Sequence, residues 1–240
     1  MTKLLSHFNN GQIDLWYASV DKHKRDIASY IQCLNDPEME KAENLRSIKE
    51  RNNYIISLAI LKKLLGYYLA KDPSDIIFSY TKYHKPYLKN CELKFNLSHS
   101  GNILLLGFSL NQEIGVDVEQ IEYFPEVDDV AKNFFSMNEY FSFCRLSPIN
   151  KIEGFYNCWT RKEAFIKAIG SGLHYSLKEF EVTLIPGKEV QLVKIKNSED
   201  EGRNWSLFSF ELLPNYKAAA AVRLKECRMS VSKYTGHLVA

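Results

Sequence analysis

The stretch Ile114-Gly115-Val116-Asp117-Val118-Glu119 alternates apolar residues with carboxylates, a pattern typical of a half-buried β-strand. Side chains of a strand alternate between its two faces, so Asp117 and Glu119 point the same way while Val116 and Val118 point into the core. Two neighbouring carboxylates repel each other, and a cation between them removes that cost. Oxygen ligands favour Mg²⁺ or Mn²⁺. The alternative is the acidic, solvent-facing side of an amphipathic strand.

About forty residues further on, Trp159-Thr160-Arg161-Lys162-Glu163-Ala164-Phe165-Ile166-Lys167 lies within a helix predicted over about 152–169, which ends at Gly170. Trp159, Glu163 and Lys167 stand four residues apart and share one face of that helix. An ordinary surface ion pair would explain Glu163 and Lys167. A functional interpretation gives Glu163 as a third metal carboxylate, with Lys162 and Lys167 neutralising phosphate oxygens.

A third motif, Asn96-Leu97-Ser98-His99-Ser100, lies at the turn between strands predicted over 95–98 and 103–109. Its hydroxyl and imidazole groups can donate hydrogen bonds to a phosphate. A nucleophile–base pair is geometrically poor, because the adjacent Ser98 and His99 face opposite sides of a strand. The alternative is a set of turn residues that satisfy local backbone groups.

The remaining pattern predicts an α+β fold. Further strands are expected over 13–20, 76–80, 180–185, 190–195, 205–212 and 218–224, and helices over about 36–65 and 130–143. Strands, a helix and a hairpin occur on both sides of Gln112. We therefore expect two closely packed halves, residues 1–112 and residues 113–240.

Composition excludes several classes of function. The 240 residues hold 31 Lys and Arg against 29 Asp and Glu, a net charge of +2, which is too small for general attraction to nucleic acid. No apolar run is long enough to span a bilayer, and the first residues lack a secretion signal, so we expect a cytoplasmic protein. The five cysteines form no Cys-x-x-Cys pair, which disfavours a zinc site. Acidic residues gather over 111–142 between two basic regions, an arrangement suited to a metal ion beside phosphates.

Taken together, KPYL (85–88), NLSHS (96–100), GVDVE (115–119), WTRKEAFIK (159–167) and GSGL (170–173) resemble the Sfp-type 4′-phosphopantetheinyl transferases. The resemblance implies two similar halves related by a pseudo-twofold axis, with the site between them. It also implies an Mg²⁺-dependent reaction (Mn²⁺ is the alternative ion). The 4′-phosphopantetheine arm of coenzyme A moves to a serine of an apo acyl or peptidyl carrier protein, and adenosine 3′,5′-bisphosphate is released.

The resemblance also assigns residues by position. It places Asp117, Glu119 and Glu163 at the metal, Lys162 and Lys167 at phosphate, Ser98 and His99 against coenzyme A, Lys85 and Pro86 at the nucleotide, and Lys41 at its 3′-phosphate. Glu163 is the best candidate for the base that accepts the serine proton, with Lys167 as its catalytic partner. Two positions depart from the family pattern. His84 replaces the Gly that usually precedes Lys-Pro. The Arg-rich, Phe-containing stretch usual in the early helix is replaced by residues 45–51, and it stays open which of Arg46, Lys49 and Arg51 contacts phosphate.

The carrier protein is expected to dock where Pro125 interrupts the chain, near Tyr123, Phe124 and Val127, with the core as the alternative for Phe124. We expect a monomer without nucleic-acid or membrane partners. Two other functions stay open: a metal-dependent phosphohydrolase acting on a nucleotide pyrophosphate, and a non-catalytic coenzyme A-binding module. The presence of all three carboxylates and both lysines argues against the second.

Overall fold

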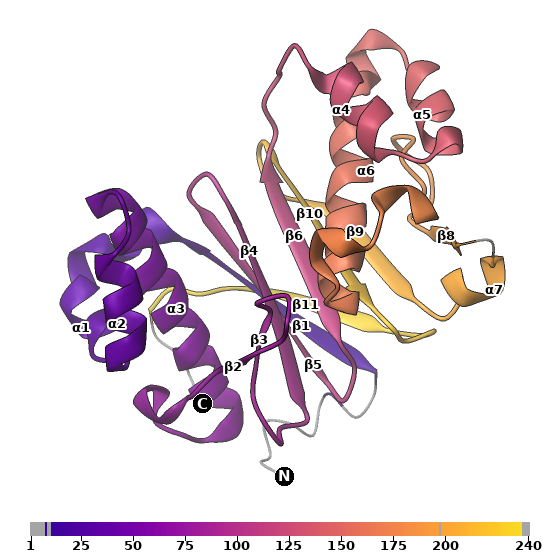
Figure 1. Cartoon of the computed structure of the whole chain (residues 1–240). Helices are drawn as coiled ribbons and strands as arrows, with labels where there is room; N and C mark the ends of the chain where they lie inside the picture. Colours follow the sequence, from indigo (N-terminus) through magenta and orange to yellow (C-terminus); the bar gives the residue numbers. More distant parts are fainter. Residues whose placement is uncertain (1–7, 9–10, 197, 237–240) are drawn as a thin grey trace.

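The computed structural model describes residue 8, residues 11–196 and residues 198–236 (Figure 1). The first half contains β1 (Gln12–Ser19), α1 (Ile27–Ile31), α2 (Asp36–Glu43), α3 (Ile48–Leu69), β2 (Ser79–Tyr80), β3 (Pro86–Tyr87), β4 (Leu93–Ser100) and β5 (Ile103–Leu110). The second contains β6 (Ile114–Gln120), α4 (Val127–Phe134), α5 (Met137–Cys144), α6 (Pro148–Ile169), β7 (Phe180–Val182), β8 (Leu192–Ile195), α7 (Glu199–Gly202), β9 (Ser206–Leu213) and β10 (Tyr216–Val222), followed by β11 (Arg228–Lys233). None of the described helices is long and apolar enough to cross a membrane.

The two halves repeat one order of elements: a strand, a long helix and a hairpin. In the first half β1 pairs antiparallel with β5, the second strand of the hairpin, and β5 pairs with β4. In the second half β6 pairs in the same way with β10, and β10 with β9. The helices α3 and α6 have 22 residues each. The α+β fold with two similar halves is thus confirmed.

The last strand, β11, crosses back to the first half. It pairs in parallel with β1, from Gln12 opposite Arg228 to Tyr17 opposite Lys233. The hydroxyl of Ser230 also donates to Oδ1 of Asp14, at 2.7 Å. Assigning all of 113–240 to the second half was therefore wrong for this segment. The physical reason is that β1 would otherwise stand at the edge of its sheet, and β11 covers that edge.

The helices predicted over 36–65 and 130–143 are each divided into two shorter helices in the structure. α2 and α3 are separated at residues 44–47, where the Ser47 side chain accepts a hydrogen bond from the Glu50 backbone and starts α3 anew. α4 and α5 are separated at residues 135–136, and Ser136 forms a capping box with Glu139. In both places a capping serine within an apolar periodic pattern marks the break.

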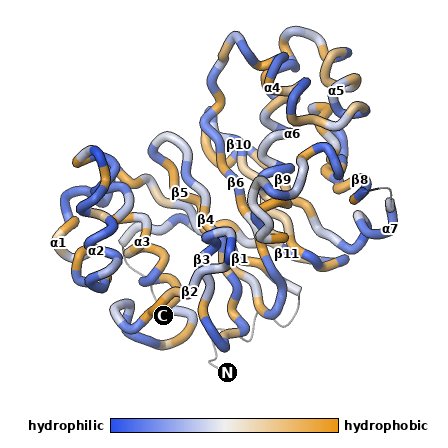
Figure 2. The backbone as a smooth tube through the Cα atoms, in the orientation of Figure 1, coloured by the Kyte–Doolittle hydropathy of each residue, from blue (hydrophilic) through white to orange (hydrophobic). Residues whose placement is uncertain are grey.

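Apolar side chains also fill the space where the two sheets meet. This group includes Ile13, Leu15 and Leu105 from the first half and Val116, Val118, Ala218 and Ala220 from the second, all fully buried. Figure 2 shows hydrophobic segments along the central strands. The burial of Val116 and Val118 confirms the predicted alternation, so the intervening Asp117 and Glu119 face away from this core.

Candidate active site

The polar motif of β4 joins the two halves. β4 and β6 are edge strands of different sheets and lie side by side (Figure 1). Asn96 Oδ1, Ser98 Oγ and Ser100 Oγ accept hydrogen bonds from the backbone N–H groups of residues 116, 118 and 120, at 2.9, 3.4 and 3.0 Å. Asn96 and Ser100 belong to the motif that the sequence singled out, but the resemblance assigned only Ser98 and His99 to the site. The sequence did contain a signal for this contact: Asn96, Ser98 and Ser100 are two residues apart and therefore share one face of the strand.

Asp117 is the centre of the site, with an exposed fraction of 2%. Its Oδ1 accepts hydrogen bonds from Ser98 Oγ at 2.9 Å and Lys167 Nζ at 2.7 Å, and Lys167 Nζ also lies 2.9 Å from Ser98 Oγ. Its other oxygen, Oδ2, is buried and has no hydrogen-bond partner within the described part of the chain. A buried carboxylate oxygen without a partner is costly, so this atom marks a place for a cation or donor.

Glu119 and Glu163 lie within electrostatic reach of Asp117. Glu119 Oε2 accepts a hydrogen bond from Ser100 Oγ at 2.8 Å. Burial, and then the negative charge of Asp117, raise the pKa of both glutamates. Burial also raises the pKa of Asp117, although Lys167 and Ser98 act in the opposite direction. The charge of Asp117 thus disfavours the ionised form of both glutamates, and a cation near the three carboxylates would relieve this repulsion.

Gly115 allows the helix to approach the strand this closely. A Cβ atom at this position would overlap the backbone of Ala164 and Ala168 in α6. The missing side chain lets α6 lie against β6, and this places Glu163 and Lys167 beside Asp117.

The donor set fits a hard divalent ion, although the described residues include no group of three or more His, Cys, Asp or Glu side chains already gathered around one point. The fit rests on the unpartnered Oδ2 of Asp117 and on carboxylate oxygens, which Mg²⁺ prefers. In the present arrangement the ammonium group of Lys167 supplies the positive charge beside Asp117.

Lys162 was predicted to face phosphate, and the structure contradicts this. Its side chain is 1% exposed; the ammonium group pairs with Glu139 Oε2 at 2.8 Å and donates to the Phe180 carbonyl at 2.7 Å. Successive helix residues point about 100° apart, so Lys162 faces the core of the second half when Glu163 faces the site. Its role is structural.

A separate pocket of about 470 Å³ opens on the first half, between α3, β4 and the β2–β3 hairpin. Its lining includes Lys41, His84, Pro86 and His99. Lys41 Nζ lies 5.3 Å from the ring centre of Tyr54. Three of the predicted coenzyme A contacts are therefore brought together. The lining includes none of Arg46, Lys49 and Arg51.

Ser98 and Lys85 do not line this pocket. Ser98 turns to the opposite face of β4 from His99 and is 6% exposed. Lys85 Nζ pairs with Glu113 at 2.8 Å and also contacts the carbonyl oxygens of Ile114 and Ala168, both at 3.4 Å. Burial lowers the pKa of Lys85. The prediction that its ammonium group contacts the nucleotide is therefore corrected. The ammonium group instead connects the first half to β6 and α6.

His84 stands where the resemblance leads us to expect Gly. Its φ is 62°, in the left-handed region, and its N–H donates to the Thr81 carbonyl at 2.9 Å. His84 thus adopts a backbone conformation that favours glycine, and it adds an exposed imidazole to the pocket.

The predicted docking residues fall into three environments. Tyr123 is 76% exposed. Phe124 is half-buried, and its ring lies 5.3 Å from that of Phe155 in an edge-on contact. Val127 is 4% exposed and belongs to the core of the second half. The prediction that Val127 contacts a carrier protein is therefore wrong. Phe124 packs partly against the core of the second half, as the alternative interpretation expected.

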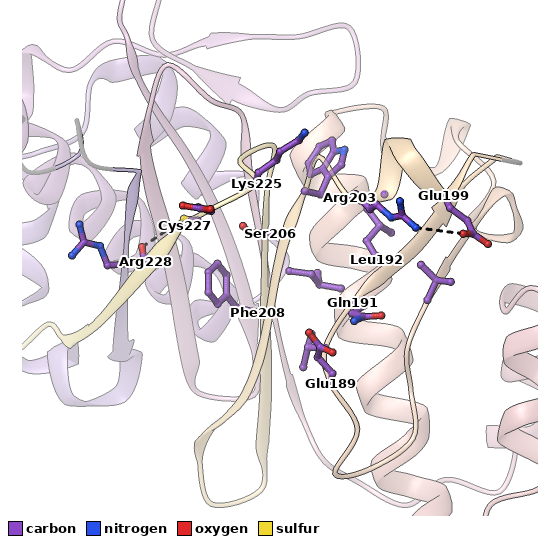
Figure 3. Close-up of a pocket in the computed structure, with 16 residues that line it drawn as sticks. Glu189, Gln191, Leu192, Glu199, Arg203, Ser206, Phe208, Lys225, Cys227 and Arg228 are labelled. Atoms are coloured by element: carbon purple, nitrogen blue, oxygen red, sulfur yellow. Dashed lines mark hydrogen bonds and ion pairs between the residues drawn. The ribbon is translucent and has the colours of Figure 1, made fainter.

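A larger cavity, about 1100 Å³, lies elsewhere, between β9, β8 and the segment before β11 (Figure 3). Its rim mixes acids such as Glu189 and Glu199 with bases such as Arg203 and Lys225. It includes none of the predicted site residues.

Carboxylates suited to a divalent ion, a lysine beside them and a pocket that holds a further lysine are typical of enzymes that transfer phosphoryl groups. Comparison with known proteins is more specific. A family model described as "4'-phosphopantetheinyl transferase superfamily" matches residues 113–221, and one described as "4'-phosphopantetheinyl transferase, N-terminal" matches residues 18–109.

Curated relatives agree with these models. The chain is 30% identical over 215 residues to the 4′-phosphopantetheinyl transferase HetI of Nostoc sp., covering 88% of this chain and 86% of the relative. It is 28% identical over 191 residues to Sfp of Bacillus subtilis, covering 79% and 82%. A putative 4′-phosphopantetheinyl transferase of Synechocystis sp. is 29% identical over 232 residues, covering 93% and 92%. The chain belongs to the 4′-phosphopantetheinyl transferase family. Neither a phosphohydrolase nor a non-catalytic binding module is supported.

Proposed function

We propose that this transferase moves the 4′-phosphopantetheine arm of coenzyme A to a serine of an apo carrier protein at the junction of its two halves. The observation that carries the proposal is the buried, unpartnered Oδ2 of Asp117 beside Lys167. The 470 Å³ pocket with Lys41 and His99 lies on the first half, on the face of β4 opposite Ser98. Its basic groups suit the phosphorylated ribose of coenzyme A, and the pyrophosphate would extend toward Asp117.

Asp117, Glu119 and Glu163 would hold Mg²⁺. The ion, when bound, neutralises charge that develops on the pyrophosphate oxygens. The proposal is supported by the oxygen-only donor set and by the charge of Asp117, which raises the pKa of both Glu119 and Glu163.

Glu163 would accept the proton of the carrier serine. Its place within electrostatic reach of Asp117, Glu119 and Lys167, where those residues meet, supports this role. Lys167 lies one helical turn further on and carries a positive charge toward the same point. It would stabilise the charge on the phosphate oxygens as the bond to the nucleotide breaks.

The carrier would approach over the segment between β6 and α4. Tyr123 is its exposed apolar group, since Val127 lies in the core. Glu122 and Glu126 flank it and are exposed, so contact with an acidic carrier would rest on the aromatic ring.

The test measures release of adenosine 3′,5′-bisphosphate from coenzyme A in the presence of Mg²⁺, with and without an apo carrier protein. We expect release only with the carrier, and loss of release on Asp117→Ala. Release at the same rate without the carrier would indicate hydrolysis and would contradict the proposal.

A further inference from the structure

The polar motif of β4 has a second role beyond joining the halves. Ser98 and Ser100 contact the carboxylates directly, whereas Asn96 contacts only the β6 backbone among the bonds described. We infer that Ser98 and Ser100 are positioning residues that fix the orientation of Asp117 and Glu119 and thereby set the affinity for the divalent ion. This inference rests on the proposed function.

The argument begins with the hydrogen-bonding capacity of a serine hydroxyl, which is one donated bond and two accepted bonds. Ser98 Oγ accepts from the N–H of Val118 at 3.4 Å and from Lys167 Nζ at 2.9 Å. Both acceptor positions are thus occupied by groups that only donate. Its hydrogen has one remaining use, which is the bond to Asp117 Oδ1 at 2.9 Å.

Ser100 repeats this arrangement two residues further along the strand. Its Oγ accepts from the N–H of Gln120 at 3.0 Å and donates to Glu119 Oε2 at 2.8 Å. Because the backbone of β6 fixes both hydroxyls, each donated bond has a fixed direction. We call Asn96, Ser98 and Ser100, with their bonds to the β6 backbone, the β4 ladder. Because β6 holds Ser98 and Ser100 in place, these serines in turn hold Asp117 and Glu119 at a fixed distance from each other.

The consequence for Asp117 is that one oxygen is held and the other is presented. Oδ1 receives two donated bonds, while Oδ2 is buried without a partner in the described structure. A carboxylate held by one oxygen loses little further rotational freedom when the other binds a cation. Loss of groups that orient metal ligands typically weakens metal binding about 10–100-fold.

Asn96 provides the matched control, because it bonds to the N–H of Val116 in the same ladder and none of its described bonds reaches a carboxylate. The experiment measures Mn²⁺ binding by electron paramagnetic resonance on the full chain without coenzyme A. We expect Ser98→Ala and Ser100→Ala to weaken Mn²⁺ binding by about tenfold or more. Ser100→Thr keeps the hydroxyl at a half-buried strand position and should bind nearly as the unaltered protein. Asn96→Ala should lower the melting temperature without changing the Mn²⁺ affinity.

Unchanged affinity in Ser100→Ala, or an equal loss in Asn96→Ala, would overturn the inference and assign the ladder a purely structural role. If Ser98→Ala fails to fold by circular dichroism, the comparison of Ser100→Ala with Ser100→Thr decides. Failure of the proposed function looks different, because the unaltered protein would then not modify a carrier whatever the Mn²⁺ result. Tight Mn²⁺ binding by Asp117→Asn would reject the metal assignment itself, and the inference with it.

Discussion

Lys41 projects from the end of α2 into the pocket of the first half, where its ammonium group lies 5.3 Å from the centre of the Tyr54 ring. A charge-assisted contact to phosphate contributes about 1.5–3 kcal/mol. We therefore expect Lys41→Ala to raise KM for coenzyme A by roughly tenfold, and to affect 3′-dephospho-coenzyme A much less. Steady-state kinetics with both substrates measure this difference.

Lys49→Ala is the control for that experiment. Lys49 is also an exposed lysine near the start of α3, but it does not line the pocket. Equal losses in the two variants would show that general positive charge, rather than a 3′-phosphate contact, explains the effect. Normal discrimination between the two substrates in Lys41→Ala would contradict its placement.

Glu163 gives a prediction that depends on pH. Its pKa is raised from 4.5 in the folded protein, so the folded state binds this proton more tightly than the unfolded chain. The free energy of unfolding therefore falls as the pH rises from about 4.5 through the raised pKa. In Mg²⁺-free buffer we expect Glu163→Gln to have a higher melting temperature than the unaltered protein at pH 8, and a smaller difference at pH 5.

The same variant should lose carrier modification by at least about 10²-fold, because it lacks the base. Glu40→Gln, at an exposed position of α2, should change neither quantity. A lower melting temperature for Glu163→Gln at pH 8 would show that the carboxylate stabilises the fold, and would argue against a repelled metal ligand.

The sequence predicted which side chains share a face well where periodicity decided it. Strand alternation placed Asp117 and Glu119 together, and helical spacing placed Glu163 and Lys167 on one face. Lys162 was misplaced, because it was grouped with Lys167 at the phosphate oxygens although it does not share the helix face of Glu163 and Lys167. Its partner Glu139 lies 23 residues earlier, and no local pattern links the two.

At the scale of elements, the buried ion pair between Lys162 and Glu139 holds α6 against its neighbours. Glu139 caps α5, accepts from the Val182 backbone and pairs with Lys162, so it connects α5, β7 and α6. Removing one member of a buried ion pair costs about 3–5 kcal/mol, because the other charge is left without a partner. Lys162→Met should therefore lower the melting temperature by roughly 10 °C.

Kinetics separate this structural role from the predicted phosphate contact. The folded fraction of Lys162→Met should keep its KM for coenzyme A. A large rise in KM for coenzyme A with an unchanged melting temperature would contradict the structural role and would support a phosphate contact by Lys162.

Element boundaries were predictable only in part. Apolar periodicity ran through residues 44–47 and 135–136, and a serine cap with its own hydrogen bonds decided each break. β11 was missed although Met229 and Val231 alternate with polar residues, because its pairing with β1 depends on a contact more than two hundred residues away in sequence.

At the scale of the whole molecule, polar contacts and strand pairing add to the apolar core that joins the two halves. The β4 ladder bonds to β6, Lys85 bridges to β6 and α6, and β11 returns to β1. The site lies where the first of these joins meets α6. The family resemblance predicted a site between two similar halves, and the structure adds that two serines of the join contact Asp117 and Glu119.

The most direct test of the central claim is the intact mass of an apo carrier protein after incubation with the protein, coenzyme A and Mg²⁺. We predict that the carrier gains the mass of one phosphopantetheine group, and that chelation of Mg²⁺ or the substitution Asp117→Ala prevents the gain while the protein remains folded. An unmodified carrier, or a gain that survives Asp117→Ala, would contradict the account.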